Sequence, residues 1–151
     1  MGSGSLGSGC ACAIKGISPK TRVICVQSSG SQAMAESFRQ RRAVELPIDT
    51  IADGLVCREP GALALRSLLA FVDDVEVVDD EQILSAVSQL TTRCKLLVEP
   101  SGAAALAAMR NRRDEIAGKR VVLVATGANI SRETLEVLNL QDHWSPTPPV
   151  A

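Results

Sequence analysis

The stretch Gly2-Ser3-Gly4-Ser5-Leu6-Gly7-Ser8-Gly9 decides how the rest of the sequence is interpreted, and it leads directly into the apolar segment 10–14. Its glycines permit backbone conformations with positive φ and place no Cβ between an anion and the amide N–H groups. If a helix begins at about Leu6, its unpaired N–H groups and its positive dipole end face the same concavity. Such a loop is suited to hold a phosphate, with the hydroxyls of Ser3 and Ser5 as further donors.

Two other interpretations of the glycines stay open at this point. A methionine followed by glycine and serine also resembles a flexible linker. The pattern Gly2-x-Gly4-x-x-Gly7 also fits the fingerprint of a Rossmann-type nucleotide-binding module. That fold requires a strand before the glycines and an acidic residue about 20 residues further on. No such strand precedes Gly2, and the next apolar run ends in Gln27-Ser28.

The composition predicts a single domain with an aliphatic core. The chain has 151 residues, 46% of them hydrophobic, and its only aromatic residues are Phe38, Phe71 and Trp144. A net charge of −1 with mixed signs gives no reason to expect a nucleic-acid or membrane surface. No apolar run reaches the roughly 18–20 residues that span a bilayer. We expect reduced, mostly buried thiols and a cytoplasmic location, because the cysteines lie in apolar periodic segments; they are Cys10, Cys12, Cys25, Cys57 and Cys94.

Hydrophobic periodicity predicts alternating helices and strands between residues 6 and 138. Expected helices are 6–15, 31–41, 61–71, one beginning after Asp79, 102–110 and one running from Ser131 to Leu138. Expected strands are 22–27, 74–78 and 120–125, and 47–55 is a turn-rich connection. Strands that alternate with helices favour an α/β fold, a three-layer parallel sheet with helices on both faces. The Pro-rich tail 141–151, which contains His143, is expected to be disordered.

Local signals mark several of these boundaries. Asp79 with Gln82 three residues later is typical of a helix N-terminus, and Ser101 and Ser131 are expected to cap the next helices. Asp53 is expected to hydrogen-bond backbone groups in its turn. The pair Cys10-x-Cys12 does not suit a metal site, because side chains two apart on a helix point away from each other.

Four segments in the same order resemble the fold-type II pyridoxal-phosphate enzymes, in particular the threonine/serine dehydratase and serine racemase group. The segments are residues 2–9, Thr50-Ile51-Ala52-Asp53-Gly54-Leu55, Glu99-Pro100-Ser101-Gly102-Ala103 and Thr126-Gly127-Ala128-Asn129. The resemblance implies the large domain of the tryptophan synthase beta-like fold, N-terminally incomplete. In this chain, residues 1–140 would form the C-terminal portion of the family's catalytic domain.

The resemblance also implies roles for individual residues toward the cofactor pyridoxal 5'-phosphate. The phosphate would be held by Gly2, Ser3, Gly4, Ser5 and Leu6. Thr126 stands where a hydroxyl meets the pyridine nitrogen, which would leave that nitrogen largely unprotonated and suit β-elimination. Glu99 stands where the family places a carboxylate close to the ring, although a charge at a helix start would also account for it.

Two departures from the family affect catalysis and metal binding. The reactive lysine of the family lies in an N-terminal segment outside this chain, and Lys15, Lys20, Lys95 and Lys119 do not resemble its motif. We therefore expect no catalytic residue within these 151 residues. Some members also bind a divalent cation with two carboxylates. This chain has Gln27 and Ala33 at those places, so we expect no metal there.

The resemblance thus implies the cofactor-binding part of a threonine/serine ammonia-lyase-like enzyme. Such an enzyme eliminates the hydroxyl group of a small amino-acid substrate and releases a 2-oxo acid and ammonia. The alternative is a non-catalytic remnant or half-domain that needs a partner chain. The missing strands would leave an open sheet edge, so we expect either a homodimer or association with a missing N-terminal half.

Overall fold

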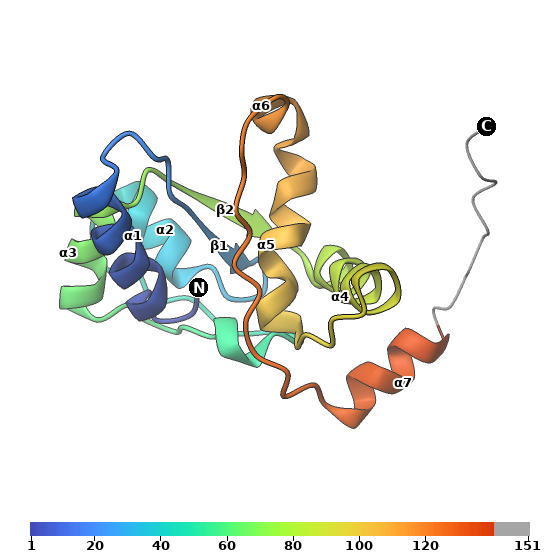
Figure 1. Cartoon of the computed structure of the whole chain (residues 1–151). Helices are drawn as coiled ribbons and strands as arrows, with labels where there is room; N and C mark the ends of the chain where they lie inside the picture. Colours follow the sequence, from blue (N-terminus) through green and yellow to red (C-terminus); the bar gives the residue numbers. More distant parts are fainter. Residues whose placement is uncertain (141–151) are drawn as a thin grey trace.

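Two parallel strands lie at the centre of the fold (Figure 1). The computed structural model describes residues 1–140. Strand β1 (Ile24–Ser28) pairs with β2 (Asp74–Val78) in a register that runs from Ile24 opposite Asp74 to Ser28 opposite Val78. The predicted strand 74–78 is confirmed at both ends, and the predicted strand 22–27 begins and ends later than expected.

Helices cover both faces of this sheet, so the predicted three-layer α/β arrangement is confirmed (Figure 1). One layer holds α1 (Ser5–Ile17), α2 (Ala33–Gln40) and α3 (Ala62–Phe71). The other layer holds α4 (Asp80–Cys94) and α5 (Pro100–Asn111), and α5 lies against both strands. Shorter elements are the 3₁₀ turn η1 (Asp53–Leu55), α6 (Arg113–Ile116) and α7 (Arg132–Leu140).

The core is aliphatic, as the composition predicts. The fully buried side chains include Met34, Leu68 and Ile83, and α5 packs closely because it presents glycine and alanine to its neighbours. Among residues 1–140 no helix is long and apolar enough to cross a bilayer. The predicted disorder of 141–151 concerns residues outside the described part of the chain.

Helix α4 begins at the cap that the sequence predicts. The Gln82 N–H donates to Asp79 Oδ1 at 2.7 Å, and the Asp79 N–H donates to Gln82 Oε1 at 3.0 Å, which forms a complete capping box. Ser131 likewise accepts a hydrogen bond from the Thr134 N–H at the start of α7.

The prediction that Ser101 caps a helix over 102–110 is wrong. Helix α5 begins at Pro100 with Glu99 at the N-cap position. Proline suits the first helical position because its fixed φ fits the helix and its missing N–H has no partner there. The Ser101 hydroxyl instead accepts a hydrogen bond from the Gly54 N–H at 2.9 Å.

The prediction of a strand over 120–125 is also wrong. This segment is extended beside α5 but belongs to no sheet among the described residues (Figure 1). A strand requires the backbone of a neighbouring strand, and in residues 1–140 β1 and β2 pair only with each other. Residues 120–125 therefore have a strand-like sequence but no partner strand within the part of the chain that the structure describes.

The expectation of mostly buried thiols holds for two of the five cysteines. Cys25 and Cys57 are buried, and burial raises the pKa of both thiols. Cys10 is half-buried, whereas Cys12 and Cys94 are exposed because they lie on the outer face of α1 and at the last residue of α4. All five are free, and residues 1–140 contain no cluster of metal-ligating side chains.

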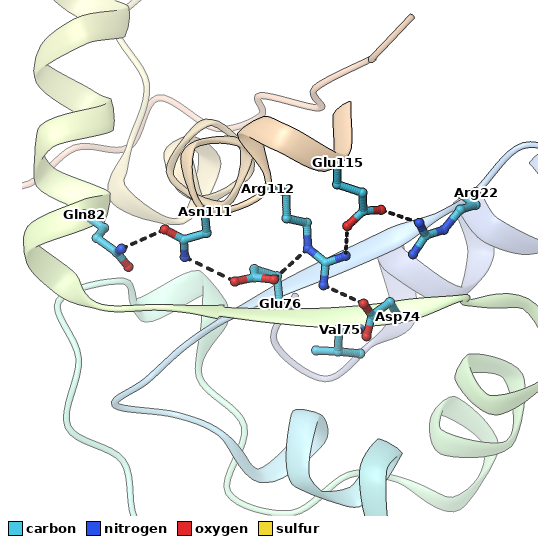
Figure 2. Close-up of polar contacts among 8 residues, drawn as sticks. All are labelled: Arg22, Asp74, Val75, Glu76, Gln82, Asn111, Arg112 and Glu115. Carbon is cyan, nitrogen blue, oxygen red and sulfur yellow. Dashed lines mark hydrogen bonds and ion pairs between the residues drawn. The ribbon is translucent and has the colours of Figure 1, made fainter. Parts of the chain in front are cut away.

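A polar network joins the sheet to the end of α5 (Figure 2). The Arg112 guanidinium donates to Glu76 Oε2 at 2.6 Å, to Asp74 Oδ2 at 2.5 Å and to Glu115 Oε2 at 3.1 Å. The network extends to Asn111, which donates to Glu76 Oε1 at 3.1 Å. Because Arg112 is only 15% exposed, these contacts are screened less than ordinary surface ion pairs.

A second polar cluster fixes the loop that contains residues 50–55. Asp80 Oδ1 accepts from Thr50 Oγ1 at 2.6 Å and from Ser28 Oγ at 3.2 Å, and Asp80 Oδ2 accepts from the Ile51 N–H at 2.9 Å. The first residue of α4 thereby ties the carboxyl end of β1 to this loop.

The variant Asp80→Asn is expected to lower the free energy of unfolding by about 1–2 kcal/mol, because an amide nitrogen cannot accept one of these hydrogen bonds. Urea denaturation followed by circular dichroism measures the change. Glu81→Gln, the same chemical change at the exposed next residue, serves as the control and is expected to stay within about 0.5 kcal/mol of the parent chain. Equal stabilities of the two variants would contradict the role given to Asp80.

Candidate cofactor-binding site

The glycine stretch forms a tight turn that ends at the N-terminus of α1. Gly4 has φ +87°, the left-handed region that favours glycine, and α1 begins at the next residue. The first backbone hydrogen bond of the helix runs from the Ser8 N–H to the Gly4 carbonyl at 2.8 Å. The N–H groups of Ser5, Leu6 and Gly7 therefore have no acceptor within the helix. Within the described residues no side chain caps this end, and its first turn holds no acidic residue. These donors are therefore available to an anion.

Serine hydroxyls lie beside these N–H groups. Ser3 Oγ and Ser5 Oγ are 3.1 Å apart, and both residues are exposed, as is Leu6. The turn thus presents backbone donors and two hydroxyls to solvent. Because the stretch forms a defined turn and the first residues of a helix, it is not a flexible linker.

Close packing explains the glycine at position 2. A Cβ on Gly2 would lie 2.8 Å from the Gly54 carbonyl oxygen and 3.1 Å from that of Val56. The start of the glycine stretch therefore contacts the 50–55 loop directly. The first two of the four predicted motifs meet at this point.

The loop at Gly54 in turn contacts the start of α5. The Gly54 N–H donates to Ser101 Oγ at 2.9 Å and to Asp53 Oδ1 at 2.7 Å. The second contact confirms the backbone hydrogen bond expected of Asp53. The first joins the second motif to the third.

Glu99 holds the fourth motif through its backbone and its carboxylate. The Glu99 N–H donates to the Gly127 carbonyl at 3.1 Å, and Glu99 Oε2 accepts from the Asn129 N–H at 2.9 Å. Gly127 has φ +84°, and a Cβ there would lie 2.5 Å from Glu99 Oε1. Only glycine allows the carboxylate to lie so close to this turn.

Thr126 lies against the first turn of α5. A Cβ on Gly102 would lie 2.0 Å from the Thr126 carbonyl oxygen, so the two backbones are in direct contact. Thr126 itself is exposed. The contacts from Gly2 through Gly54, Ser101 and Glu99 to Thr126 bring all four predicted motifs into one region.

Two residues of these motifs make contacts in this region that the sequence did not predict. The Asn129 N–H and the Ser101 hydroxyl hold the carboxylate and the loop in place. A serine directly after Glu-Pro suggests a cap, and only the packing of α5 against the 50–55 loop shows its actual partner.

The lysines, and the position where some family members bind a cation, lie in other surroundings. Lys15 Nζ forms an ion pair with Asp73 at 2.7 Å, and Lys95 Nζ donates to the Thr92 carbonyl at 2.8 Å. Gln27 is fully buried, and its Oε1 accepts from the Ala35 N–H at 2.8 Å. Its Nε2 has no hydrogen-bond partner among the described residues.

A parallel α/β fold with an uncapped, glycine-containing helix N-terminus is an arrangement that suits the binding of an anion such as a phosphate group. Residues 1–127 match the family described as "Pyridoxal-phosphate dependent enzyme". The chain therefore belongs to this family, and the match overturns the alternative of a Rossmann-type module.

Individual relatives carry related names. The chain is 35% identical to an L-threonine ammonia-lyase of Geobacter sulfurreducens over 91% of this chain and 35% of that protein. An L-threonine ammonia-lyase of Thermotoga maritima is 36% identical over 86% of this chain and 32% of its own length. The chain thus spans about a third of the length of the curated relatives it matches.

Solved structures agree with this assignment. The threonine deaminase of T.th. superposes with a TM-score of 0.82 at 32% identity and covers 87% of this chain and 44% of its own. Maize serine racemase also superposes with a TM-score of 0.82 at 32% identity, over 93% of this chain and 46% of its own.

Proposed function

We propose that these residues form the cofactor-binding part of a pyridoxal-phosphate dependent ammonia-lyase that acts on threonine or serine. The observation that carries the proposal is the contact of all four motifs in one region. The names of the relatives support the substrate class, a small hydroxy amino acid. The five free cysteines are consistent with the cytoplasmic location expected from the sequence.

The cofactor phosphate would be held by residues 2–6. The N–H groups at the start of α1 and the positive end of its dipole favour a dianion there, and the Ser3 and Ser5 hydroxyls add donors. A Cβ on Gly2 would lie 2.8 Å from the Gly54 carbonyl oxygen and one on Gly4 2.8 Å from the Met34 side chain, so these glycines allow the turn to pack against the 50–55 loop and α2. The exposed hydroxyls and the uncapped helix end of this turn support the assignment.

Thr126 and Glu99 would face the ring of the cofactor. The Thr126 hydroxyl would hydrogen-bond the pyridine nitrogen without placing a charge beside it, which suits elimination of a β-hydroxyl. Glu99 would hold the Thr126–Asn129 turn in position, since its carboxylate accepts from Asn129. When bound, pyridoxal phosphate supplies an electron sink for negative charge that develops at the substrate Cα.

Titration of the ¹⁵N-labelled chain with pyridoxal phosphate is expected to shift the amide signals of Ser5, Leu6 and Gly7 more than other signals. Pyridoxal, which carries no phosphate, is the matched ligand and is expected to leave these three signals nearly unchanged. Heteronuclear correlation spectra measure both effects, and neither depends on turnover.

Two glycine variants test whether the turn at Gly4 in particular is needed for cofactor binding. Gly4→Ala forces a side chain into the left-handed region, at a cost of about 1–2 kcal/mol, and is expected to weaken pyridoxal-phosphate binding about tenfold. The helical variant Gly9→Ala, whose Cβ meets nothing within 4 Å, is expected to bind as the parent chain does. Equal shifts with the two ligands, or equal affinities of the two variants, would contradict the proposal.

A further inference from the structure

Gly54 lies between the first turn of α5 and the turn at residues 2–6. Its N–H donates to Ser101 Oγ at 2.9 Å, and a Cβ on Gly54 would lie 2.7 Å from that oxygen and 3.0 Å from Ser101 Cβ. On the other side, a Cβ on Gly2 would lie 2.8 Å from the Gly54 carbonyl oxygen. Helix α5 therefore reaches the turn at residues 2–6 through Gly54.

The Gly54 N–H has two acceptors, and they act differently on the position of the loop. Asp53 Oδ1 accepts at 2.7 Å, but Asp53 is the preceding residue and moves with the loop. Ser101 is 47 positions away in the sequence, on a helix that lies against both strands. Of the two hydrogen bonds, only the one to Ser101 ties Gly54 to another element.

Other contacts keep the 50–55 loop folded without Ser101. Asp80 Oδ2 accepts from the Ile51 N–H at 2.9 Å, and the Leu55 side chain is 5% exposed and belongs to the core. Loss of the Ser101 hydroxyl therefore leaves the loop anchored on both sides of Gly54. What it removes is the contact that sets where Gly54 lies relative to α5.

The first turn of α5 contacts both ends of the proposed site. Through Gly102 it packs against the Thr126 turn, since a Cβ on Gly102 would lie 2.0 Å from the Thr126 carbonyl oxygen. Through Ser101 it holds Gly54, which in turn packs against Gly2. These two neighbouring residues of one helix turn therefore set the spacing between residues 2–6 and Thr126.

We propose that Ser101 is a positioning residue for the phosphate group of the cofactor. Its hydroxyl fixes Gly54, and Gly54 fixes the turn at residues 2–6 at the distance from Thr126 that one cofactor spans. The inference rests on the proposed function, because it assigns the phosphate to this turn.

Titration with pyridoxal phosphate, followed by the ³¹P signal of its phosphate group, compares the parent chain with variants at positions 101 and 53. Ser101→Ala is expected to weaken binding about fivefold, because the loop loses its hydrogen bond to α5. Ser101→Thr keeps a hydroxyl and is expected to bind within about twofold of the parent. Asp53→Ala removes the other acceptor of the same N–H and is expected to bind at least as tightly as the parent, since the charge it removes is negative like that of the phosphate. Ser101→Ala is expected to unfold at nearly the same urea concentration as the parent, because its Gly54 N–H keeps Asp53 as an acceptor.

Heteronuclear correlation spectra of the ligand-free chains test the coupling without the cofactor. Ser101→Ala is expected to shift the amide signals of Gly4 and Ser5 as well as that of Gly54, whereas Asp53→Ala is expected to shift signals of the 50–55 loop only. Unshifted Gly4 and Ser5 signals in Ser101→Ala would overturn the inference. Equal affinities of Ser101→Ala and the parent, or equal losses in Ser101→Ala and Ser101→Thr, would also overturn it and leave the proposed function standing. A parent chain that does not bind pyridoxal phosphate would overturn the proposed function, and this inference with it.

Discussion

Gly102→Ala is expected to lower the free energy of unfolding by about 2–3 kcal/mol, although alanine is normally the better helix former. The added Cβ would lie 2.0 Å from the Thr126 carbonyl oxygen and 2.6 Å from a methyl group of Val98. Backbone cannot yield as the end of a flexible side chain can, so α5 and the Thr126 turn must separate. Urea denaturation followed by circular dichroism measures the loss.

The control for this prediction is Gly9→Ala in α1. Nothing lies within 4 Å of the Cβ position there, so the helix-propensity gain of roughly 0.5–1 kcal/mol is expected without a clash. Replacing glycine by alanine should thus lower the free energy of unfolding at position 102 and raise it at position 9. A stabilised Gly102→Ala chain would show that Thr126 does not lie against α5.

Arg112→Met is expected to cost about 2 kcal/mol. Methionine keeps most of the apolar stem but leaves Glu76 and Asp74 without their shared cation, at 19% and 40% side-chain exposure. The loss falls below the ~3–5 kcal/mol typical of fully buried pairs because Asp74 retains contact with water. Calorimetric or urea unfolding measures it.

The matched control is Arg132→Met, which removes an ion pair between Arg132 and Glu136 on the surface of α7. Those side chains are 87% and 59% exposed, so a change within about 0.5 kcal/mol is expected. If both variants lose the same stability, the network in Figure 2 contributes no more than an ordinary surface pair.

The Arg112 network also predicts a dependence of stability on acid. Burial raises the pKa of the Asp74 carboxyl, but the hydrogen bonds from Arg112 and from the Val75 N–H outweigh it and hold the pKa below its ordinary value of 3.8. A carboxyl whose pKa is lower in the folded chain stabilises it above the unfolded pKa and loses that contribution as pH falls through the folded pKa. Below about pH 4, the stability difference between the parent chain and Arg112→Met should therefore shrink.

Features determined by neighbouring residues were predictable from the sequence. Asp79 and Gln82 complete each other's hydrogen bonds within one turn, and the stripe that includes Ile83 and Leu90 is buried as its spacing indicates. The four motifs of the site were also identified, because together and in the same order they resemble those of the pyridoxal-phosphate enzymes. The cofactor roles of residues 2–6, Glu99 and Thr126 stay predictions.

Features that depend on distant contacts were not predictable in this way. Residues 120–125 have the composition of a strand, but pairing depends on a neighbour that the local sequence does not contain. Arg112 contacts carboxylates up to 38 positions away, and no periodicity indicates that they converge. The start of α5 was misplaced for a local reason, since the proline at its first position was a stronger signal than the serine after it.

The parallel pairing of β1 and β2 has a consequence for how the chain acquires its shape. The first pair of this register is Ile24 with Asp74, and these two residues are 50 positions apart in the sequence. Closing a loop of that length costs about 3–4 kcal/mol of chain entropy before any contact compensates for it. During synthesis on the ribosome, the complete sheet therefore cannot form until Val78 has left the exit tunnel, and β1 lacks its partner strand until then.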